Sequence, residues 1–497
     1  MPITRCFLPH FPAALTGKPK PPAAQRLRQQ LQTLSHLSLP DLQALLGSTF
    51  SEDFFLKTPA HDDPPGESVK RRRGIYTPIL VFWSFFFQVL NPRMPCLAAV
   101  AKIRAWMARK PCKKLPSLNT GAYCLARSGL ASSFFTAALD ELRQRLLQRA
   151  TLAWKWHGHQ VKVLDGTSYS MPDTEANQGQ WPQPKGQKKG CGFPVAKLLG
   201  LFCLSTGAWI GHAVDTCYRH DLSLWQRLKH LLVPGDVLLG DAGYCAWALM
   251  AELKARGVDS VMRLHQKRPK DMRRGKALGQ CDRLQTWLKP KQRGKQCPWS
   301  VSEWVALPAS LQVRVLHITI ERKGFRTTQL WLATTLTDPI RYSAESLAEL
   351  YYRRWSIELF LRDLKTTMQM EVLRCKTPNM VLKELTMHAI VYNTLRLLML
   401  ESATTHQVEL GRISFKSSLD LVIQWLPECG NQDASRRQIT KWRADLSLAM
   451  SEVLNDIRPD RMEPRARKRR PKSSSLLTRP RHQFKEIPHR ERYRKVA

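Results

Sequence analysis

The chain has 497 residues, 43% of them hydrophobic, with 78 Lys and Arg against 40 Asp and Glu, a formal net charge of +38. This length predicts two to four folding units, and the hydrophobic content excludes a chain that is disordered throughout. So large a positive excess repels itself unless an anionic partner offsets it. Nucleic acid is the commonest such partner, although ribosomal, chromatin and membrane-surface proteins share the composition.

Neither a membrane span, a zinc knuckle nor a dense disulfide scaffold is expected. The longest apolar run, residues 75–90, is shorter than the roughly 20 residues that a bilayer requires, and it contains Thr, Ser and Gln. The N-terminus lacks a clean signal-peptide core. The twelve cysteines include no C-x-x-C pair, which fits a reducing cytoplasm.

Residues 20–150 have apolar side chains at helical spacing and no strand alternation. Basic residues gather on either side of the Phe-rich segment within this region: Lys70, Arg71, Arg72 and Arg73 before it, and Arg104, Arg109, Lys110, Lys113 and Lys114 after it. Such a run is usually a solvated surface. In a chain this basic, it favours a helical domain that contacts DNA.

The period changes near residue 160. Residues 161–169 predict a strand, and residues 197–216 predict two strands joined by a turn at 205–208. A helix over 222–232, a strand over 236–240, a helix over 245–256 and a strand over 260–264 follow. Three strands, helix, strand, helix, strand is the order of the ribonuclease H-like fold, so we predict an α/β chain with such a core.

A β-rich insertion is expected to interrupt this core at residues 267–335, which begin with a basic stretch and continue with strand-like runs. Helical spacing resumes at Ser343, a plausible N-cap, and helices fill most of 380–456. The tail from residue 458 has 15 Lys and Arg against 4 Asp and Glu. It predicts a mostly disordered arm for nucleic acid.

The segment 351–365 carries a polar stripe on one predicted helix. At about 100° per residue, Tyr351, Arg354, Glu358 and Lys365 fall within an arc of about 60°. Apolar side chains flank the stripe, with Trp355 and Leu359 on one side and Leu350, Ile357 and Leu361 on the other. A surface ladder of ion pairs would leave those flanks in water, so we expect an inward-packed stripe with a part-buried carboxylate.

Two aspartates at predicted strand ends complete a candidate metal site with Glu358. Asp165 closes the run VKVLD on the first strand, and Asp241 closes DVLLGD on the fourth. These strands are neighbours in a ribonuclease H-like sheet, so the two carboxylates would face each other. Either aspartate alone is more often a turn residue. Together, the three carboxylates could hold two Mg²⁺ ions across a phosphodiester, with Mn²⁺ able to substitute.

These motifs resemble those of the DDE transposases of the insertion-sequence-four family. Tyr351, Arg354, Glu358 and Lys365 match the family's Y-x2-R-x3-E-x6-K signature, and DGT at Asp165 and GDAGY at Asp241 are similar to its two aspartate motifs. The resemblance covers roughly residues 150–400, including the β insertion. It implies a DDE transposase that binds the terminal repeats of an insertion sequence, cleaves DNA and transfers 3′ ends to a target.

The resemblance also implies a role for each matching residue. Asp165, Asp241 and Glu358 would be the catalytic, metal-binding triad, and Tyr351, Arg354 and Lys365 would contact phosphates of the transposon end. In relatives, a tryptophan of the insertion stacks on a base flipped out during hairpin formation, and Trp331 stands at the matching place. The alternative for Trp331 is a strand-core tryptophan. Weaker candidates are Trp287, Trp299 and Trp304.

The predicted organisation has six parts: a helical DNA-end-binding region, 1–150; the core, 151–266 and 336–405; the insertion, 267–335; a helical region, 406–457; and the basic tail, 458–497. Double-stranded DNA, as transposon ends and target, is the expected partner. A homodimer in the synaptic complex and a cytoplasmic, nucleoid-associated location are also expected. A ribonuclease H-like nuclease or resolvase without strand transfer, and an inactive DNA-binding derivative, remain alternatives.

Overall fold

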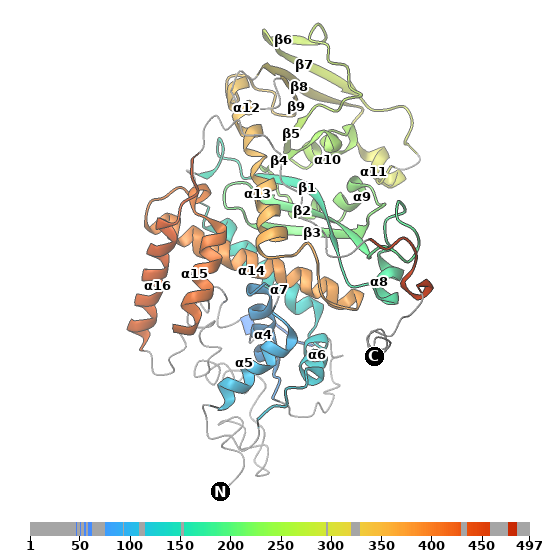
Figure 1. Ribbon diagram of the computed structural model, residues 1–497. Coiled ribbons are helices and arrows are strands. Elements are labelled where there is room, and N and C mark those ends of the chain that lie inside the picture. Colours follow the sequence, from blue (N-terminus) through green and yellow to red (C-terminus); the bar gives the residue numbers. More distant parts are fainter. Residues whose placement is uncertain are drawn as a thin grey trace, which may run out of the picture.

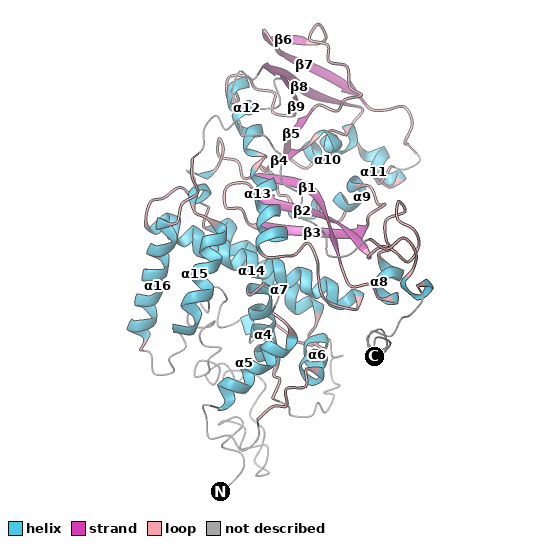
Figure 2. Cartoon of the chain, in the orientation of Figure 1, coloured by secondary structure: helices cyan, strands magenta, loops and turns pink. Residues whose placement is uncertain are grey.

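The computed structural model describes residues 46, 50, 54–55, 58–61, 75–92, 94–108, 115–150, 154–294, 297–319, 329–428, 435–457 and 476–484. A nine-stranded sheet occupies one end of the molecule and helices gather at the other (Figures 1 and 2). The predicted α/β class is therefore confirmed. No helix within the described ranges is both long and apolar enough to cross a membrane.

Five strands form the first part of the sheet: β1 (Val161–Ser170), β2 (Val195–Cys203), β3 (Trp209–Thr216), β4 (Val237–Gly240) and β5 (Asp259–Arg263). They lie in the order β3-β2-β1-β4-β5. β1, β4 and β5 run parallel to one another, whereas β2 and β3 are antiparallel to their neighbours. Gly207 has a φ of 69° in the turn between β2 and β3, a conformation that glycine adopts without strain.

The segment expected to be a β-rich insertion continues the same sheet. Its strands are β6 (Lys276–Gly279), β7 (Asp282–Leu288), β8 (Ser310–Thr319) and β9 (Gln329–Thr334). β9 pairs with β5, and β8, β7 and β6 follow outward from it. The Arg314 guanidinium on β8 forms a buried ion pair with Asp282 on β7 and donates to the Tyr342 carbonyl at 2.6 Å. This contact ties the outer strands to the segment that precedes the signature helix.

The register of β1 and β4 determines where the two motif aspartates lie. Val161 is opposite Val237 and Val163 is opposite Leu239. Asp165 and Asp241 each follow by two residues, so extending this register places them opposite each other. The strand predicted over 161–169 is confirmed, but Asp165 lies within it and not at its end, because β2 pairs with β1 from Lys162 through Ser170.

Helices make up most of the remainder of the described chain. Their bounds are α4 (Pro78–Leu90), α5 (Cys96–Ala108), α6 (Gly121–Ser128), α7 (Ser132–Gln148), α8 (Glu175–Gln180), α9 (Asp221–Trp225), α10 (Trp247–Ala255), α11 (Val301–Ala306), α12 (Ala344–Arg353), α13 (Ser356–Arg362), α14 (Pro378–Thr405), α15 (Phe415–Glu428) and α16 (Arg436–Glu452). The long α14 is buried on most of its surface and packs against α4, α7, α15 and α16 (Figure 1). It therefore joins the N-terminal and C-terminal helices.

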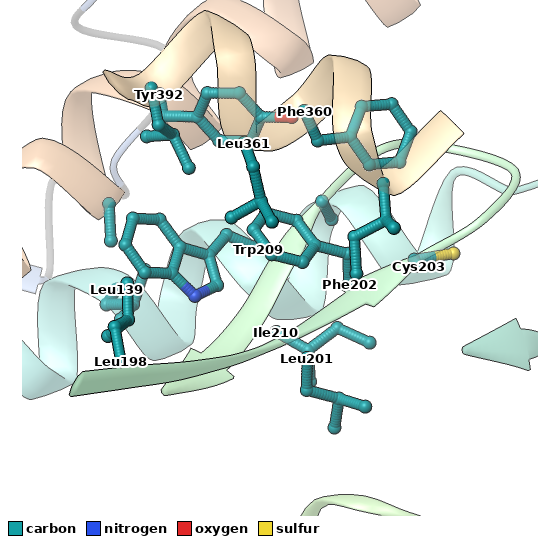
Figure 3. Close-up of a cluster of buried hydrophobic side chains, with 14 of the residues drawn as sticks. Leu139, Leu198, Leu201, Phe202, Cys203, Trp209, Ile210, Phe360, Leu361 and Tyr392 are labelled. Atoms are coloured by element: carbon teal, nitrogen blue, oxygen red, sulfur yellow. The ribbon is translucent and has the colours of Figure 1, made fainter. Parts of the chain in front are cut away.

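A buried aromatic cluster packs α13 and α14 against the sheet (Figure 3). The rings of Phe202 and Trp209 stack with centroids 5.6 Å apart, and Phe360 of α13 approaches Phe202 at 5.8 Å. The Asn393 side chain on α14 accepts from the Trp209 N–H at 2.8 Å and donates to the Trp209 carbonyl at 2.9 Å. The Asn393 amide thus forms hydrogen bonds with the backbone N–H and carbonyl of Trp209 on the edge strand β3. Without it, these buried backbone groups would lack partners.

The segment predicted as one helix over 351–365 is divided between α12 and α13. At the break, the Ile357 N–H donates to the Arg354 carbonyl and the Glu358 N–H to the Trp355 carbonyl, each three residues back. Residues 363–367 then form a π-helix. Because these turns depart from the 3.6 residues per turn of an α-helix, Tyr351, Arg354, Glu358 and Lys365 do not keep the shared helix face that was predicted for them. Trp355 and Leu359 are exposed, so the prediction that both flanks pack inward is wrong.

Several predictions concern residues outside the described ranges. These are the basic run at 70–73, the basic residues at 109–114, the helices expected before residue 46, and most of the tail beyond residue 457. Arg104, on α5, is described, and its guanidinium donates to the Pro116 carbonyl at 3.4 Å. This contact ties α5 to the segment that follows it.

Asp363, directly after α13, should make stability depend on pH. Burial raises its pKa to about 6, although Arg396 and Arg362 act to lower it. A buried acid with a raised pKa favours the folded state only while protonated, so stability falls as the pH rises from below 4 through about 6, by about 3 kcal/mol. Asp363→Asn should remove that fall and raise the free energy of unfolding at pH 7 by about 1–3 kcal/mol.

Urea denaturation at several values between pH 4 and 8 measures this effect. The matched control is Asp173→Asn, because Asp173 is exposed and its substitution should leave the pH profile unchanged. An Asp363→Asn profile with the slope of the parent chain would contradict the assignment.

Candidate active site

Asp165 and Asp241 bring two carboxylates together at the centre of the sheet. β1 carries Asp165 in its middle, and Asp241 follows β4 at the start of a short 3₁₀ turn, Ala242–Tyr244. The Gly166 N–H donates to Asp165 Oδ1 at 2.8 Å, which fixes the orientation of that carboxylate. The predicted meeting of the two aspartates follows from the register of the parallel strands.

The electrostatics of Asp165 show that three carboxylates share one region. Burial raises the pKa of Asp165 most, and the negative charges of Asp241 and Glu358 raise it further. The hydrogen bond from Gly166 and the charge of Arg354 lower it. The ionised form of Asp165 is therefore less favoured than that of a free aspartate, mainly because the side chain is buried.

Glu358 reaches this region from α13, which packs against β1. It lies in the first turn of α13, with its side chain 53% exposed, and Arg354 Nη2 is 3.9 Å from Glu358 Oε1. Glu358 is thus exposed and not part-buried as predicted, because the break before α13 turns its start outward. An acidic residue in a first turn is also favoured by the helix dipole.

Tyr351 and Arg354 are both buried next to these carboxylates. The Arg354 guanidinium lies 5.6 Å from the centroid of the Tyr351 ring. Burial raises the pKa of Tyr351, with Asp241 acting in the same direction, whereas Arg354 and Arg263 lower it. Tyr351 is therefore a neutral phenol whose pKa is influenced by the charges of both Asp241 and Arg354. Among the residues predicted from the sequence, Asp241, Glu358 and Arg354 therefore lie close enough to influence the charge of Asp165, and Tyr351 lies close enough to be influenced by Asp241.

Lys365 and Trp331 have other neighbours. Lys365 lies in the π-helix, with Nζ 3.9 Å from Glu371 Oε1. Trp331 lies half-buried on β9, and its ring stacks on His317 with centroids 4.3 Å apart. The stack on His317 covers one face of the indole. The weaker candidates Trp287 and Trp299 are buried in the core, and Trp304 packs against Trp247.

Sequence reasoning missed a further carboxylate beside the site. Asp221, the first residue of α9, lies 3.1 Å from the Tyr244 hydroxyl, which belongs to the GDAGY motif. It also pairs with Lys197 of β2. An aspartate at a helix start is so common a feature that nothing in the sequence around Asp221 marks it as part of the site.

The donor set suits a hard divalent cation by its chemistry. Asp165, Asp241 and Glu358 offer carboxylate oxygens, the ligands that Mg²⁺ prefers. Within the described part of the chain, however, no group of three or more Asp, Glu, His or Cys side chains stands close enough to hold an ion. The carboxylates converge, yet they would have to draw nearer to one another to share a metal.

Comparison with known proteins finds a matching family model and a similar transposase. Residues 156–394 match the family model described as "Transposase DDE domain". The chain is 26% identical over 359 residues to "Transposase InsG for insertion sequence element IS4" of Escherichia coli (strain K12), covering 72% of this chain and 78% of that protein. Both matches support the resemblance to the insertion-sequence-four family of DDE transposases. The resemblance read from the Y-x2-R-x3-E-x6-K signature and its two aspartate motifs is thereby confirmed.

Among solved structures, this chain is similar to the piggyBac transposase in its synaptic complex with hairpin DNA. The similarity covers 83% of this chain and 85% of the other, with 8% sequence identity and a TM-score of 0.40. The matched DDE domain begins before β1 and ends within α14, so Asp165, Asp241 and Glu358 all lie inside it. DNA transposition is the process in which this family acts.

Two basic residues of the signature should differ in their effect on folding. Arg354 is 8% exposed and offsets the charge of Asp165, so Arg354→Ala leaves a cavity and uncompensated carboxylates and should cost about 2–4 kcal/mol. Lys365→Ala removes only the contact with Glu371, worth less than about 1 kcal/mol. Thermal denaturation compares them, with exposed Arg353→Ala as the control. Equal losses for Arg354 and Arg353 would contradict the assignment.

Proposed function

We propose that this transposase binds the terminal repeats of an insertion sequence, cleaves the DNA by metal-dependent phosphodiester hydrolysis and transfers the 3′ ends to target DNA. The observation that carries the proposal is the placement of Asp165 opposite Asp241, with Glu358 in electrostatic reach of Asp165. A site of this kind, inside a matched DDE domain, combines acidic ligands with nearby basic side chains.

The topology supports a ribonuclease H-like core. β1, β2 and β3 are antiparallel, with the short α8 between β1 and β2, and α9, β4, α10 and β5 follow in that order. β1 lies beside β4. We accordingly divide the chain as the sequence predicts, with the core at 151–266 and 336–405. In this division, the insertion at 267–335 extends the core sheet through β9.

Asp165, Asp241 and Glu358 would together hold divalent ions, for which two Mg²⁺ are proposed and Mn²⁺ can substitute. When bound, such ions activate an attacking water or 3′-hydroxyl and stabilise the leaving oxygen. The chain itself contributes orientation: Gly166 holds Asp165 by its N–H, and Arg354 lies beside Glu358. The raised pKa of Asp165 means that a cation there would favour the ionised, ligating form.

We assign DNA contacts to Tyr351, Arg354, Lys365 and Trp331. Arg354 and Lys365 are suited to phosphates of the transposon end, because cations near a scissile bond both position the backbone and offset developing charge. Trp331 has one ring face covered by His317, so a flipped base would stack on the other. The net charge of +38 suits duplex DNA, both transposon ends and target. A homodimer in the synaptic complex, acting at the bacterial nucleoid, completes the proposal.

A nuclease or resolvase without strand transfer is the second candidate, and an inactive DNA-binding derivative the third. The presence of all three carboxylates argues against the inactive derivative. The buried Tyr351 and Arg354 beside them are a feature that simple hydrolysis does not require, and they favour the transposase. Joining of cleaved 3′ ends to a second duplex separates transposase from nuclease.

Each of Asp165→Ala, Asp241→Ala and Glu358→Ala should lower cleavage by several orders of magnitude while leaving end binding largely intact, because phosphate contacts come from other residues. Purified protein is incubated with its terminal repeats and a second duplex, with and without Mg²⁺, and the strands are resolved on gels. Asp215→Ala is the control. Asp215 lies on the outer strand β3, and its carboxylate pairs with Arg227. Near-normal cleavage by Asp241→Ala would sink the proposal.

A further inference from the structure

A carboxylate that the proposed chemistry does not use lies between the two aspartate motifs. Asp221 pairs through Oδ1 with Lys197 Nζ at 2.9 Å. Its Oδ2 accepts from the Tyr244 hydroxyl at 3.1 Å. Lys197 belongs to β2, Asp221 to α9 and Tyr244 to the turn after β4, so one carboxylate connects three separate elements of the sheet region.

Asp221 lies against the backbone of the first motif. A Cβ added to Gly166 would stand 3.0 Å from Asp221 Oδ2 and 3.6 Å from the Tyr244 hydroxyl. Gly166 follows Asp165 and donates its N–H to that carboxylate. The absence of a side chain at Gly166 therefore lets Asp221 and Tyr244 approach the strand beside Asp165.

Tyr244, which donates to Asp221, also contacts the second aspartate motif, GDAGY at Asp241. The Tyr244 N–H donates to the Asp241 carbonyl at 2.9 Å within the 3₁₀ turn. Burial raises the pKa of Tyr244, and the charges of Asp221, Asp165 and Asp241 raise it further. The phenol therefore keeps its proton and acts as a donor to Asp221, and its backbone holds the residue that carries the second carboxylate.

We propose that Lys197, Asp221 and Tyr244 form a clamp that sets the separation of Asp165 and Asp241, with Asp221 and Tyr244 as positioning residues for these two carboxylates. The inference rests on the proposed function, in which the aspartates share a divalent ion. Lys197 neutralises Asp221, so Asp221 adds little repulsion to the site. A carboxylate held by an ammonium and a phenol is also poorly placed to act as a ligand itself.

The clamp explains how two carboxylates are held near each other. Their repulsion would tend to separate the Asp241 turn from β1, since β4 ends at Gly240 and no strand pairing continues to Asp241. The Tyr244–Asp221 hydrogen bond and the Asp221–Lys197 ion pair oppose that separation through side chains. Partners that hold ligating carboxylates typically change metal affinity or activity by about 10- to 100-fold when removed.

Tyr244→Phe and Asp221→Asn test the clamp in the full chain. Binding of Mn²⁺ is measured by the electron paramagnetic resonance signal of the free ion, and cleavage of terminal-repeat DNA is measured against Mg²⁺ concentration. Both variants should weaken Mn²⁺ binding about 10-fold or more and raise the half-saturating Mg²⁺ concentration similarly. End binding without metal should be unchanged, and cleavage should recover in part at saturating Mg²⁺.

Two matched variants control for general loss of polar contacts. Tyr218→Phe removes a hydroxyl that donates to the Gln183 carbonyl at 2.9 Å, and Asp271→Asn removes an ion pair with Arg273. Neither residue belongs to the clamp, so both should keep the parent's Mn²⁺ affinity. Gly166→Ala is a third test variant, because its Cβ displaces Asp221, and it should share the phenotype of Asp221→Asn.

The outcomes separate the clamp from the proposed function. If the parent chain binds no Mn²⁺ and cleaves no terminal-repeat DNA, the proposed function fails and the clamp fails with it. If the parent binds and cleaves, but Tyr244→Phe and Asp221→Asn match their controls in Mn²⁺ affinity, only the clamp is overturned. If these variants lose thermal stability while their metal affinity is normal, the contacts serve the fold alone and the clamp is again overturned.

Discussion

Three residue pairs, Val161 with Val237, Lys162 with Leu238 and Val163 with Leu239, hold β1 parallel to β4, and the position of both motif aspartates follows from this register. A slip of one residue would turn the side chain of Asp241 to the other face of the sheet. A buried ion pair disfavours that slip. Lys162 of β1 lies with its Nζ 2.5 Å from Oδ2 of Asp236, the residue just before β4. Breaking it would leave an unpaired buried charge, so the pair favours this register over its neighbours.

The convergence of Asp165, Asp241 and Glu358 concentrates negative charge in a protein whose overall charge is strongly positive. The structure limits the resulting repulsion locally: Arg354 is buried beside the carboxylates, and Glu358 remains largely in solvent. The burial of Arg354 and the exposure of Glu358 do not remove this repulsion, since Asp241 and Glu358 still raise the pKa of Asp165. An added cation would therefore lower the cost of ionising Asp165.

The sequence predicted the elements from β1 to β5 and the meeting of Asp165 with Asp241, because strand periodicity and chain order determine which strand ends are neighbours. It did not predict that β9 joins the insertion to the core sheet, because that depends on pairing between residues far apart in the chain. Asp221 was missed for a similar reason: its partners Lys197 and Tyr244 are more than twenty residues away in the chain, and nothing local to Asp221 marks it.

The break between α12 and α13 explains why an arginine and a glutamate one turn apart can have opposite surroundings. In a continuous helix, residues four apart share a face, so Arg354 and Glu358 would both be buried or both be exposed. The tight turn at 354–355 rotates α13 relative to α12, and Arg354 packs inward while Glu358 faces solvent. The Glu358 carboxylate is therefore accessible from solvent, and Arg354, which lies beside it, remains buried in the core.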